Sequence, residues 1–286
     1  ASSATALAEM HLNQKPPEIK IENFDLRMLL THTITEALEN FKQWCHSSDS
    51  NQIDRWASEY QETDMVVFEN FGSKKLFDCI HREASHLLHV EGERRDLNMK
   101  QTGDTPRKYI SVGRDIIHRH NGLIPKLFES SELRNLFSQI TNSDVHPVDY
   151  TPEQYIINRQ ESTGDTHGWH CDDYQWAFIW VMDAPQPSSG GRVEYIPRVI
   201  FDPSQPLKSL EEILRVRESR SKWLPSGAAY LMRANRTLHR VTPLTKDQTR
   251  TVVVMTFASE EDNDREIDHT TMQILYPNET LSANGE

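Results

Sequence analysis

The sequence predicts a mainly β fold with flanking helices, in which the second half of the chain forms a sandwich or jelly roll. Short runs rich in β-branched and aromatic residues recur between residues 150 and 260, and clusters of Pro, Gly, Ser and Asp separate them. The first half instead shows helical periodicity. The expected strands are Gln154–Asn158, Trp176–Met182, Arg192–Pro197, Ala228–Met232, Thr237–Pro243 and Arg250–Ala258.

Helices are expected in the first half, because apolar residues recur there three and four positions apart. The three segments are Met28–Trp44, Leu76–His89 and Leu123–Ile140. We expect these helices to pack outside the sheet. A further segment, Leu207–Trp223, has apolar residues on one side and charges on the other, which predicts a surface helix inserted between strands.

The domain organisation follows from length and from local composition. A chain of 286 residues can form one large domain or two small ones, and we expect one domain at residues 19–286. Residues 1–18 lack the basic and then apolar build of a signal peptide, and are expected to form a flexible leader. Within the domain, residues 19–149 are expected to be mostly helical support, residues 150–260 the jelly-roll core and residues 261–286 a C-terminal extension.

Charge and hydropathy indicate which classes of binding partner this chain is expected to have. Forty-three acidic residues against 31 basic ones give a net charge of −12, which disfavours binding to phosphate backbones and anionic lipid. No apolar run approaches the roughly 20 residues of a membrane span. We therefore expect a small molecule or a peptide as substrate, and neither nucleic acid nor membrane as partner.

Cysteine usage indicates the compartment. The three cysteines are Cys45, Cys79 and Cys171, which are widely spaced and include no CxxC pair. This pattern fits a reducing compartment, and we expect the cytoplasm. The oligomeric state is not predicted.

A candidate metal site begins in Thr166–Tyr174, which reads THGWHCDDY. His170 and Asp172 lie two residues apart, and at the end of a strand both can turn toward one point. His239, from a distant strand, can complete a facial triad of the kind that holds Fe(II) with open positions. Arg250 follows eleven residues later, and its guanidinium can bind the far carboxylate of a 2-oxo dicarboxylic acid that chelates the metal.

Other interpretations of these histidines exist. An HxD tripeptide by itself is weak evidence, since a lone histidine is more often a surface residue or a hydrogen-bonded core residue. The triad, the arginine and the surrounding strands together favour a metal site. His118 and His120 are expected to be polar residues of a loop or a helix end, because no carboxylate lies at suitable spacing.

Residues 154–258 resemble the core of the Fe(II)/2-oxoglutarate-dependent oxygenase superfamily, whose fold is a double-stranded β-helix (a cupin-like jelly roll). The resemblance implies that His170, Asp172 and His239 hold Fe(II), that Arg250 binds 2-oxoglutarate, and that O2 is the third reactant. Many members have a serine two residues after the arginine, where this chain has Val252. The alternatives for a second carboxylate anchor are Thr242, Tyr155 and Tyr195.

A narrower resemblance rests on His167-Gly168-Trp169-His170. This HGWH motif is similar to that of the free-amino-acid hydroxylases and halogenases typified by lysine halogenases. The resemblance implies that a small group of side chains surrounds the substrate, with one cation for a substrate carboxylate. The group comprises Glu153, His167 and Asp173, and the cation is Arg107, for which a solvated loop residue is the alternative.

The metal carboxylate bears on the type of reaction. The halogenases of that group have glycine at the position of Asp172, which leaves a coordination site for chloride. The carboxylate of Asp172 would occupy that site, so the resemblance implies hydroxylation or a related oxidation.

Strand alternation predicts which side chains face the substrate. If Arg250 points into the barrel, then Val252, Val254 and Thr256 share its face. Thr251, Val253, Met255 and Phe257 then face outward, under the flanking helices. The resulting pocket is partly polar, and its acidic rim suits an ammonium group.

The expected function is oxidation, most simply hydroxylation, of an unactivated C–H bond in a free amino acid or a small amine-bearing metabolite, with release of succinate and CO2. One alternative is the same chemistry on a protein residue or a peptide-like natural product, including desaturation or cyclisation. Another is a non-catalytic jelly-roll binding protein. The sequence predicts neither the substrate nor the carbon oxidised and its stereochemistry.

Overall fold

The structure is a computed structural model that describes the backbone of residues 23–279 and the side chains from residue 31 onward. The chain divides after Glu36 into two units, and the described residues from Ala37 onward form one compact unit. Helix α2 (Asn23–Ser47) runs across this division. The expected leader, residues 1–18, lies outside the described residues.

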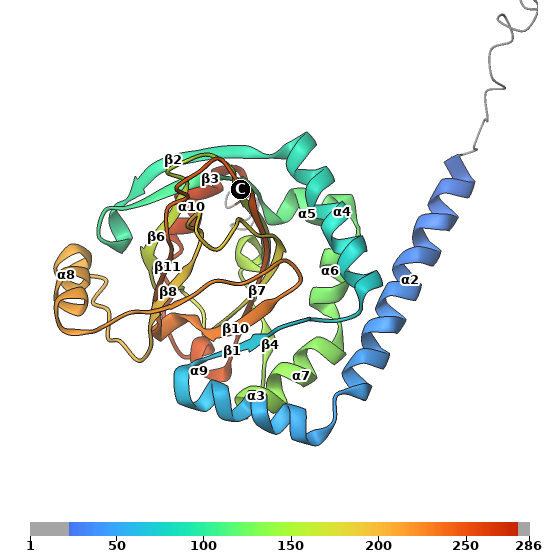
Figure 1. Ribbon diagram of the computed structural model, residues 1–286, viewed down its shortest axis with the longest axis horizontal. Coiled ribbons are helices and arrows are strands. Elements are labelled where there is room, and N and C mark those ends of the chain that lie inside the picture. The colour runs from blue at the N-terminus through green and yellow to red at the C-terminus, as the bar shows by residue number, and fades with distance from the viewer. Residues whose placement is uncertain (1–22, 280–286) are drawn as a thin grey trace, which may run out of the picture. The chain divides into compact units, whose positions relative to one another are not determined.

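One curled antiparallel sheet forms the centre of this unit, which confirms the mainly β fold with a jelly-roll core (Figure 1). Its strands follow the order β1-β10-β7-β12-β5-β3-β6-β11-β8-β9, with β2 added to β3 and β4 to β12. The bounds are β1 Met65–Phe68, β2 Glu93–Met99, β3 Thr105–Val112, β4 His146–Pro147, β5 Tyr155–Gln160, β6 Thr166–His170, β7 Trp176–Asp183, β8 Val193–Ile196, β9 Arg220–Lys222, β10 Ala229–Arg233, β11 Leu238–Val241 and β12 Arg250–Ala258.

Helices flank the sheet on one side, as expected (Figure 1). Phe257 on β12 is fully buried and lies against Phe128 and Phe137, with ring centroids 5.0 and 5.6 Å apart. The outward face of β12 is therefore covered by helices, as strand alternation predicted. The helices on this side are α3 (Ser50–Thr63), α4 (Lys74–Glu91), α5 (Arg114–His120), α6 (Leu123–Glu129) and α7 (Ser131–Thr141).

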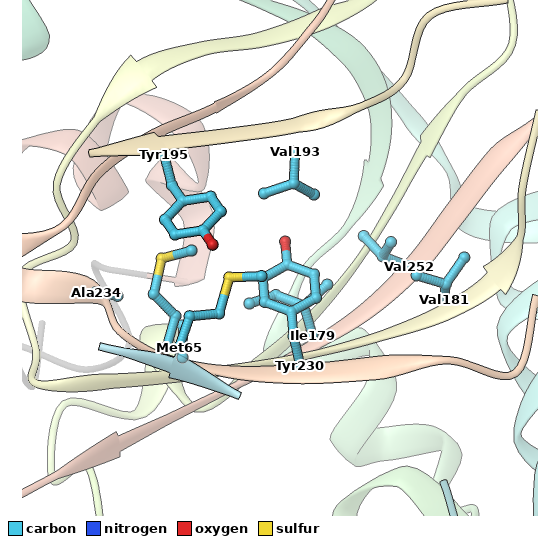
Figure 2. Close-up of a cluster of buried hydrophobic side chains, with 10 residues drawn as sticks. Met65, Ile179, Val181, Val193, Tyr195, Tyr230, Ala234 and Val252 are labelled. Atoms are coloured by element: carbon cyan, nitrogen blue, oxygen red, sulfur yellow. The ribbon is translucent and has the colours of Figure 1, made fainter. Parts of the chain in front are cut away.

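A buried cluster packs inside the sheet, between strands that are far apart in the sheet order. Figure 2 shows Tyr230 of β10 and Tyr195 of β8 projecting into it, together with Met65, Val193 and Val252. Residues of β1, β7, β8, β10 and β12 thus meet in one apolar contact region, which we call the interior cluster. This packing holds the two sides of the curled sheet against each other.

The structure corrects two expected helices. The segment Leu123–Ile140 is two helices, because Ser130 ends α6 and caps α7 by accepting a hydrogen bond from the Leu133 N–H. The insert at residues 207–223 is helical only in α8 (Pro206–Val216), and its remainder contains β9. The residues of β9 are Arg-Ser-Lys, which offer no apolar side to a helix, and they pair with β8 instead.

The hairpin of β2 and β3 was missed, in a region expected to be mostly helical. Its strands pair over seven residue pairs, from Glu93 with Ser111 to Met99 with Thr105. Gly103 and Asp104 both have positive φ, as the reversal requires. The β2 sequence ERRDLNM has little apolar content, so hydropathy gave no strand signal there.

The C-terminal residues return to the barrel. After β12 come α9 (Glu260–Asn263) and α10 (Thr270–Leu275). Met272, Leu275 and Tyr276 are buried against Met99. The segment that was expected to be an extension is thus part of the cavity wall. Along the described chain, no helix has the length and hydropathy needed to cross a bilayer.

Candidate metal centre and its cavity

A cavity of about 150 Å³ lies inside the curled sheet, and every side chain predicted for the site lines it. The predicted set is His170, Asp172, His239, Arg250, Glu153, His167, Asp173, Arg107, Val254 and Thr256. These residues lie on five separate segments of the sequence, and the fold brings them together around one space.

His170, Asp172 and His239 converge at this cavity. Backbone pairing between β6 and β11 sets His170 opposite His239, and Asp172 follows just after the end of β6. Oδ1 of Asp172 lies 3.3 Å from Nε2 of His170 and 3.5 Å from Nε2 of His239. Ligands on adjacent positions of a metal with bonds of roughly 2.1 Å are about 3 Å apart, so the spacing fits a facial triad.

Hydrogen bonds fix both imidazoles in the form that binds a metal. Nδ1 of His170 donates to the carbonyl of Gly168, and Nδ1 of His239 donates to the carbonyl of Thr237, each at 2.8 Å. A carbonyl can only accept, so in the neutral ring Nε2 carries the lone pair. Burial lowers the pKa of His170 to about 4, which keeps this ring neutral at physiological pH. Two imidazole nitrogens and one carboxylate suit Fe(II).

Arg250 lies at one end of the cavity, without a carboxylate partner among the described residues. Its side chain is 5% exposed, and Nη1 donates to Oε1 of Gln160 at 3.4 Å. Burial lowers the pKa of the guanidinium, whereas the neighbouring Tyr230 raises it. Gly191 has a φ of +65°, and a Cβ there would lie 3.2 Å from Cδ of Arg250. A side chain at position 191 would therefore crowd the stem of Arg250.

Glu153 and Asp173 form an acidic pair elsewhere in the cavity wall. Burial raises the pKa of Glu153 to about 8, and burial together with Glu153 raises that of Asp173 well above its ordinary value. Nδ1 of His269 lies 3.4 Å from Oε1 of Glu153, and its ring stacks on Tyr150 with centroids 3.6 Å apart. A pair of buried carboxyls at neutral pH shares protons or takes up a cation.

These two charged regions lie at opposite ends of β12. Arg250 pairs with Gln160 at the start of the strand, whereas the Thr256 N–H donates to the Gln154 carbonyl, next to Glu153. Six residues of strand separate Arg250 from Thr256, which corresponds to about 20 Å. The arginine and the pair of carboxyls therefore occupy different ends of the cavity.

Arg107 is a buried strand residue, which corrects the alternative of a solvated loop. It lies on β3 opposite His167 and is 1% exposed. Nη1 donates to the hydroxyl of Thr105 and Nη2 to that of Thr102, whereas Nε has no hydrogen-bond partner within the described part of the chain. His167 stacks flat on His170, with centroids 4.2 Å apart. Both residues thus flank the candidate metal ligands.

The alternatives for a second carboxylate anchor lie outside the cavity lining. The Tyr155 hydroxyl contacts Nδ1 of His118, and the Thr242 hydroxyl accepts from the Arg192 N–H. Tyr195 is buried in the interior cluster. His118 and His120 lie at the end of α5, as expected.

Sequence reasoning missed several residues of the cavity wall. Tyr230 and Gln160 stand near Arg250, and Met272, Leu275 and Tyr276 come from the C-terminal segment. Gln160 could have been found, because it faces Arg250 across the β5–β12 ladder. The others carry no local signal, because their place depends on how distant segments pack.

Comparison with protein families shows the family to which the chain belongs. The model of a family described as halogenase D matches residues 48–277. The chain belongs to the halogenase D family. A search of curated proteins found no match. The matched range of this halogenase D member includes all ten predicted site residues.

Solved structures resemble this halogenase D member in fold. The α-ketoglutarate-dependent epimerase SnoN from nogalamycin biosynthesis is 14% identical, with a TM-score of 0.57, over 74% of this chain and 84% of SnoN. SnoN in complex with Fe3+, α-ketoglutarate and nogalamycin RO gives a TM-score of 0.54 at 13% identity, over 74% and 85% of the two chains. A prolyl hydroxylase from Trichoplax adhaerens, in complex with a peptide fragment, gives 0.54 at 12% identity, over 76% and 97%. These likenesses agree with the predicted jelly-roll fold.

Proposed function

We propose that this protein is an Fe(II)/2-oxoglutarate-dependent oxygenase that oxidises, most simply hydroxylates, a C–H bond of a free amino acid or a small amine-bearing metabolite. His170, Asp172 and His239 hold the iron, and Arg250 binds the far carboxylate of 2-oxoglutarate. The convergence of two Nε2 atoms on one carboxylate oxygen carries this proposal, inside a cavity that also contains a buried arginine with no carboxylate partner among the described residues. Family membership and the fold of the solved neighbours support it.

The residues present fit the metal and the co-substrate. The donor set is two imidazoles whose Nδ1–H groups are already bound to carbonyls and one carboxylate, Asp172, whose pKa the two neighbouring histidines lower against the effect of burial. Near Arg250, the Nε2 group of Gln160 is a buried donor with no hydrogen-bond partner among the described residues. Iron with 2-oxoglutarate and O2 supplies the oxidising power, through decarboxylation to succinate and CO2.

Asp172 favours oxygenation over halogenation, although the family takes its description from a halogenase. The carboxylate lies within reach of the same point as the two histidines, so it takes a coordination position that a halide would need. Hydroxylation or a related oxidation then follows, with water excluded by the buried cavity.

The acidic end supports an amine as the substrate. Glu153 is buried and Asp173 is half-buried, and burial raises the pKa of both carboxyls, so an ammonium group would offset the cost of their negative charge. His269 and Tyr150 narrow the space around this pair. The contribution of these residues is to orient one C–H bond toward the metal.

A larger substrate is the second candidate. The Trichoplax prolyl hydroxylase among the solved neighbours is described in complex with a peptide fragment, whereas SnoN is described with nogalamycin RO. In this chain, Met272, Leu275 and Tyr276 cover part of the cavity, which favours a substrate that is enclosed over one that passes through.

A turnover screen tests the proposal. Purified protein is supplied with Fe(II), ascorbate and 2-oxoglutarate, and succinate release is measured with each free amino acid and with peptides that carry the same side chains. We expect succinate release coupled to oxidation of an amine-bearing small molecule. Release with peptides only would contradict the substrate class, and no release with any substrate would contradict the enzyme class.

Variants of the acidic pair test the substrate assignment. Glu153→Gln and Asp173→Asn each remove a charge and keep the shape. We expect weaker binding of the amine substrate, retained binding of metal and 2-oxoglutarate, and continued slow decarboxylation without product. Normal substrate oxidation by both variants would show that the pair does not hold the amine.

A further inference from the structure

The end of the cavity around Arg250 contains more hydrogen-bonding capacity than the chain itself uses. The guanidinium is buried, and its neighbours are the neutral side chains of Gln160 and Tyr230. A buried cation without a counter-ion is costly, and an incoming carboxylate would remove that cost. The neighbouring side chains that can also donate to such a carboxylate are therefore candidates to complete the site.

Gln160 is oriented by Arg250. It lies directly opposite Arg250 in the β5–β12 ladder, and its Oε1 accepts from Nη1 at 3.4 Å. A guanidinium has donors only, so the carboxamide must present oxygen to it and NH2 away from it. That Nε2 group is buried, lines the cavity and has no partner among the described residues. A donor in this state is suited to an acceptor from a ligand.

Tyr230 is the second neutral neighbour of Arg250. It comes from β10, is 3% exposed, and lines the cavity. Figure 2 shows its hydroxyl directed into the interior cluster from β10, with Tyr195 projecting from β8. Tyr230 and Arg250 line the same cavity, and Arg250 lowers the pKa of the phenol against the raising effect of burial.

We propose that Gln160 and Tyr230 complete the site for the far carboxylate of 2-oxoglutarate, with the Gln160 amide and the Tyr230 hydroxyl as donors beside the Arg250 guanidinium. The site then has three donor groups for one carboxylate. The two added donors take the role of the serine that many members of the superfamily have where this chain has Val252. This inference rests on the proposed function, because it assigns residues to the same co-substrate.

The test compares two ligands that differ only at the far end. 2-Oxoglutarate and 2-oxopentanoate are titrated by calorimetry into Mn(II)-loaded protein, so that binding is measured without turnover. Both ligands can chelate the metal, and only the first has the far carboxylate. Tyr230→Phe and Gln160→Met each remove one donor at nearly constant shape. A hydrogen bond to a charged group corresponds to about a 10- to 150-fold change in affinity.

The expected result is a loss of that size in 2-oxoglutarate affinity for each variant, with 2-oxopentanoate affinity within about threefold of wild type. Gln160→Glu is expected to lose most, because the new carboxylate pairs with Arg250 and repels the ligand. Tyr195→Phe is the matched control: it removes a buried hydroxyl from the same cluster outside the cavity lining, and 2-oxoglutarate affinity is expected to stay unchanged.

Three outcomes would overturn the inference. The first is wild-type affinity for 2-oxoglutarate in both Tyr230→Phe and Gln160→Met. The second is an equal loss for both ligands, which would indicate general damage to the cavity. The third is an effect of Tyr195→Phe as large as that of Tyr230→Phe. If the wild-type Mn(II) protein binds neither 2-oxo acid, the proposed function itself fails, and this result differs from the other three.

Discussion

At the scale of single residues, the backbone prepares the two histidines for metal binding. Each Nδ1–H donates to the carbonyl of the residue two positions earlier, Gly168 for His170 and Thr237 for His239. The same local geometry therefore repeats on two strands that are distant in sequence. This repetition fixes the tautomer of both rings before any ion arrives, and it lowers the cost of ordering the site.

The sequence was sufficient to predict the candidate ligands, because the HxD motif, the distal histidine and the arginine occur at characteristic spacing. It was not sufficient for Tyr230 or His269. Tyr230 lies in an ordinary apolar strand, and His269 lies in a polar segment after the last strand. Tyr230 lines the cavity and His269 contacts Glu153 only because distant segments pack together, and no local pattern encodes that packing.

Asp172→Gly tests the carboxylate ligand. Removing the side chain frees one coordination position while both histidines remain. We expect the variant to retain metal more weakly than the wild type, to lose most hydroxylation, and to form some product that depends on added chloride or azide. Mass spectrometry of the product measures this. Hydroxylation at the wild-type rate would mean that Asp172 is not a ligand.

Arg250→Ala tests the co-substrate anchor. The substitution deletes a charge-assisted contact with the far carboxylate, so the KM for 2-oxoglutarate should rise by roughly 10- to 150-fold. The KM for the amine substrate should change little, because that substrate binds toward the other end of β12. Steady-state kinetics with each substrate varied in turn provides the comparison, and an unchanged KM for 2-oxoglutarate would place the anchor elsewhere.

At the scale of secondary-structure elements, alternation along β12 was predictable and the hairpin of β2 and β3 was not. In β12, side chains alternate between the two faces of the strand, so the direction of Arg250 predicts that of all the others. The alternate residues Val252, Val254 and Thr256 do line the cavity together with Arg250. In β2, the side chains are mostly polar, and the strand exists because its backbone pairs with β3. The hairpin matters for the site, since β3 carries Arg107.

Glu83 supports the start of α6 and makes stability depend on pH. Its carboxylate accepts hydrogen bonds from the backbone N–H groups of Leu123 and Ile124. Burial nevertheless raises the pKa of Glu83 to about 7, above the roughly 4.3 of an unfolded chain. A raised folded-state pKa gives stability that is fully present below the unfolded pKa and is lost as pH rises through about 7.

Glu83→Gln tests this linkage, because glutamine keeps an acceptor for the helix start and does not titrate. Between pH 5 and pH 8, the wild-type free energy of unfolding should fall relative to that of the variant by on the order of 2 kcal/mol. Urea unfolding of both proteins at the two pH values measures the difference. A difference that is the same at both pH values would show that Glu83 does not titrate in this range.

At the scale of the whole molecule, the curled sheet separates two kinds of recognition along one cavity. The Arg250 end is cationic, the Glu153 and Asp173 end is acidic, and the candidate metal ligands are shared between strands β6 and β11 and the turn after β6. The jelly-roll class was predictable from strand spacing. The contribution of the C-terminal residues to the cavity wall was not predictable, because α10 is only six residues long. Its apolar residues are buried by packing against Met99, which is distant in the sequence.

The central claim is that His170, Asp172 and His239 together hold one Fe(II). Anaerobic equilibrium binding of Fe(II) to the wild type and to His170→Ala, Asp172→Ala and His239→Ala tests it most directly, with His118→Ala as a control for a histidine outside the cavity lining. The account predicts one tightly bound Fe(II) per wild-type and His118→Ala chain, and markedly weaker binding in each of the other three variants. Undiminished binding in any of those three, or no binding by the wild type, would contradict it.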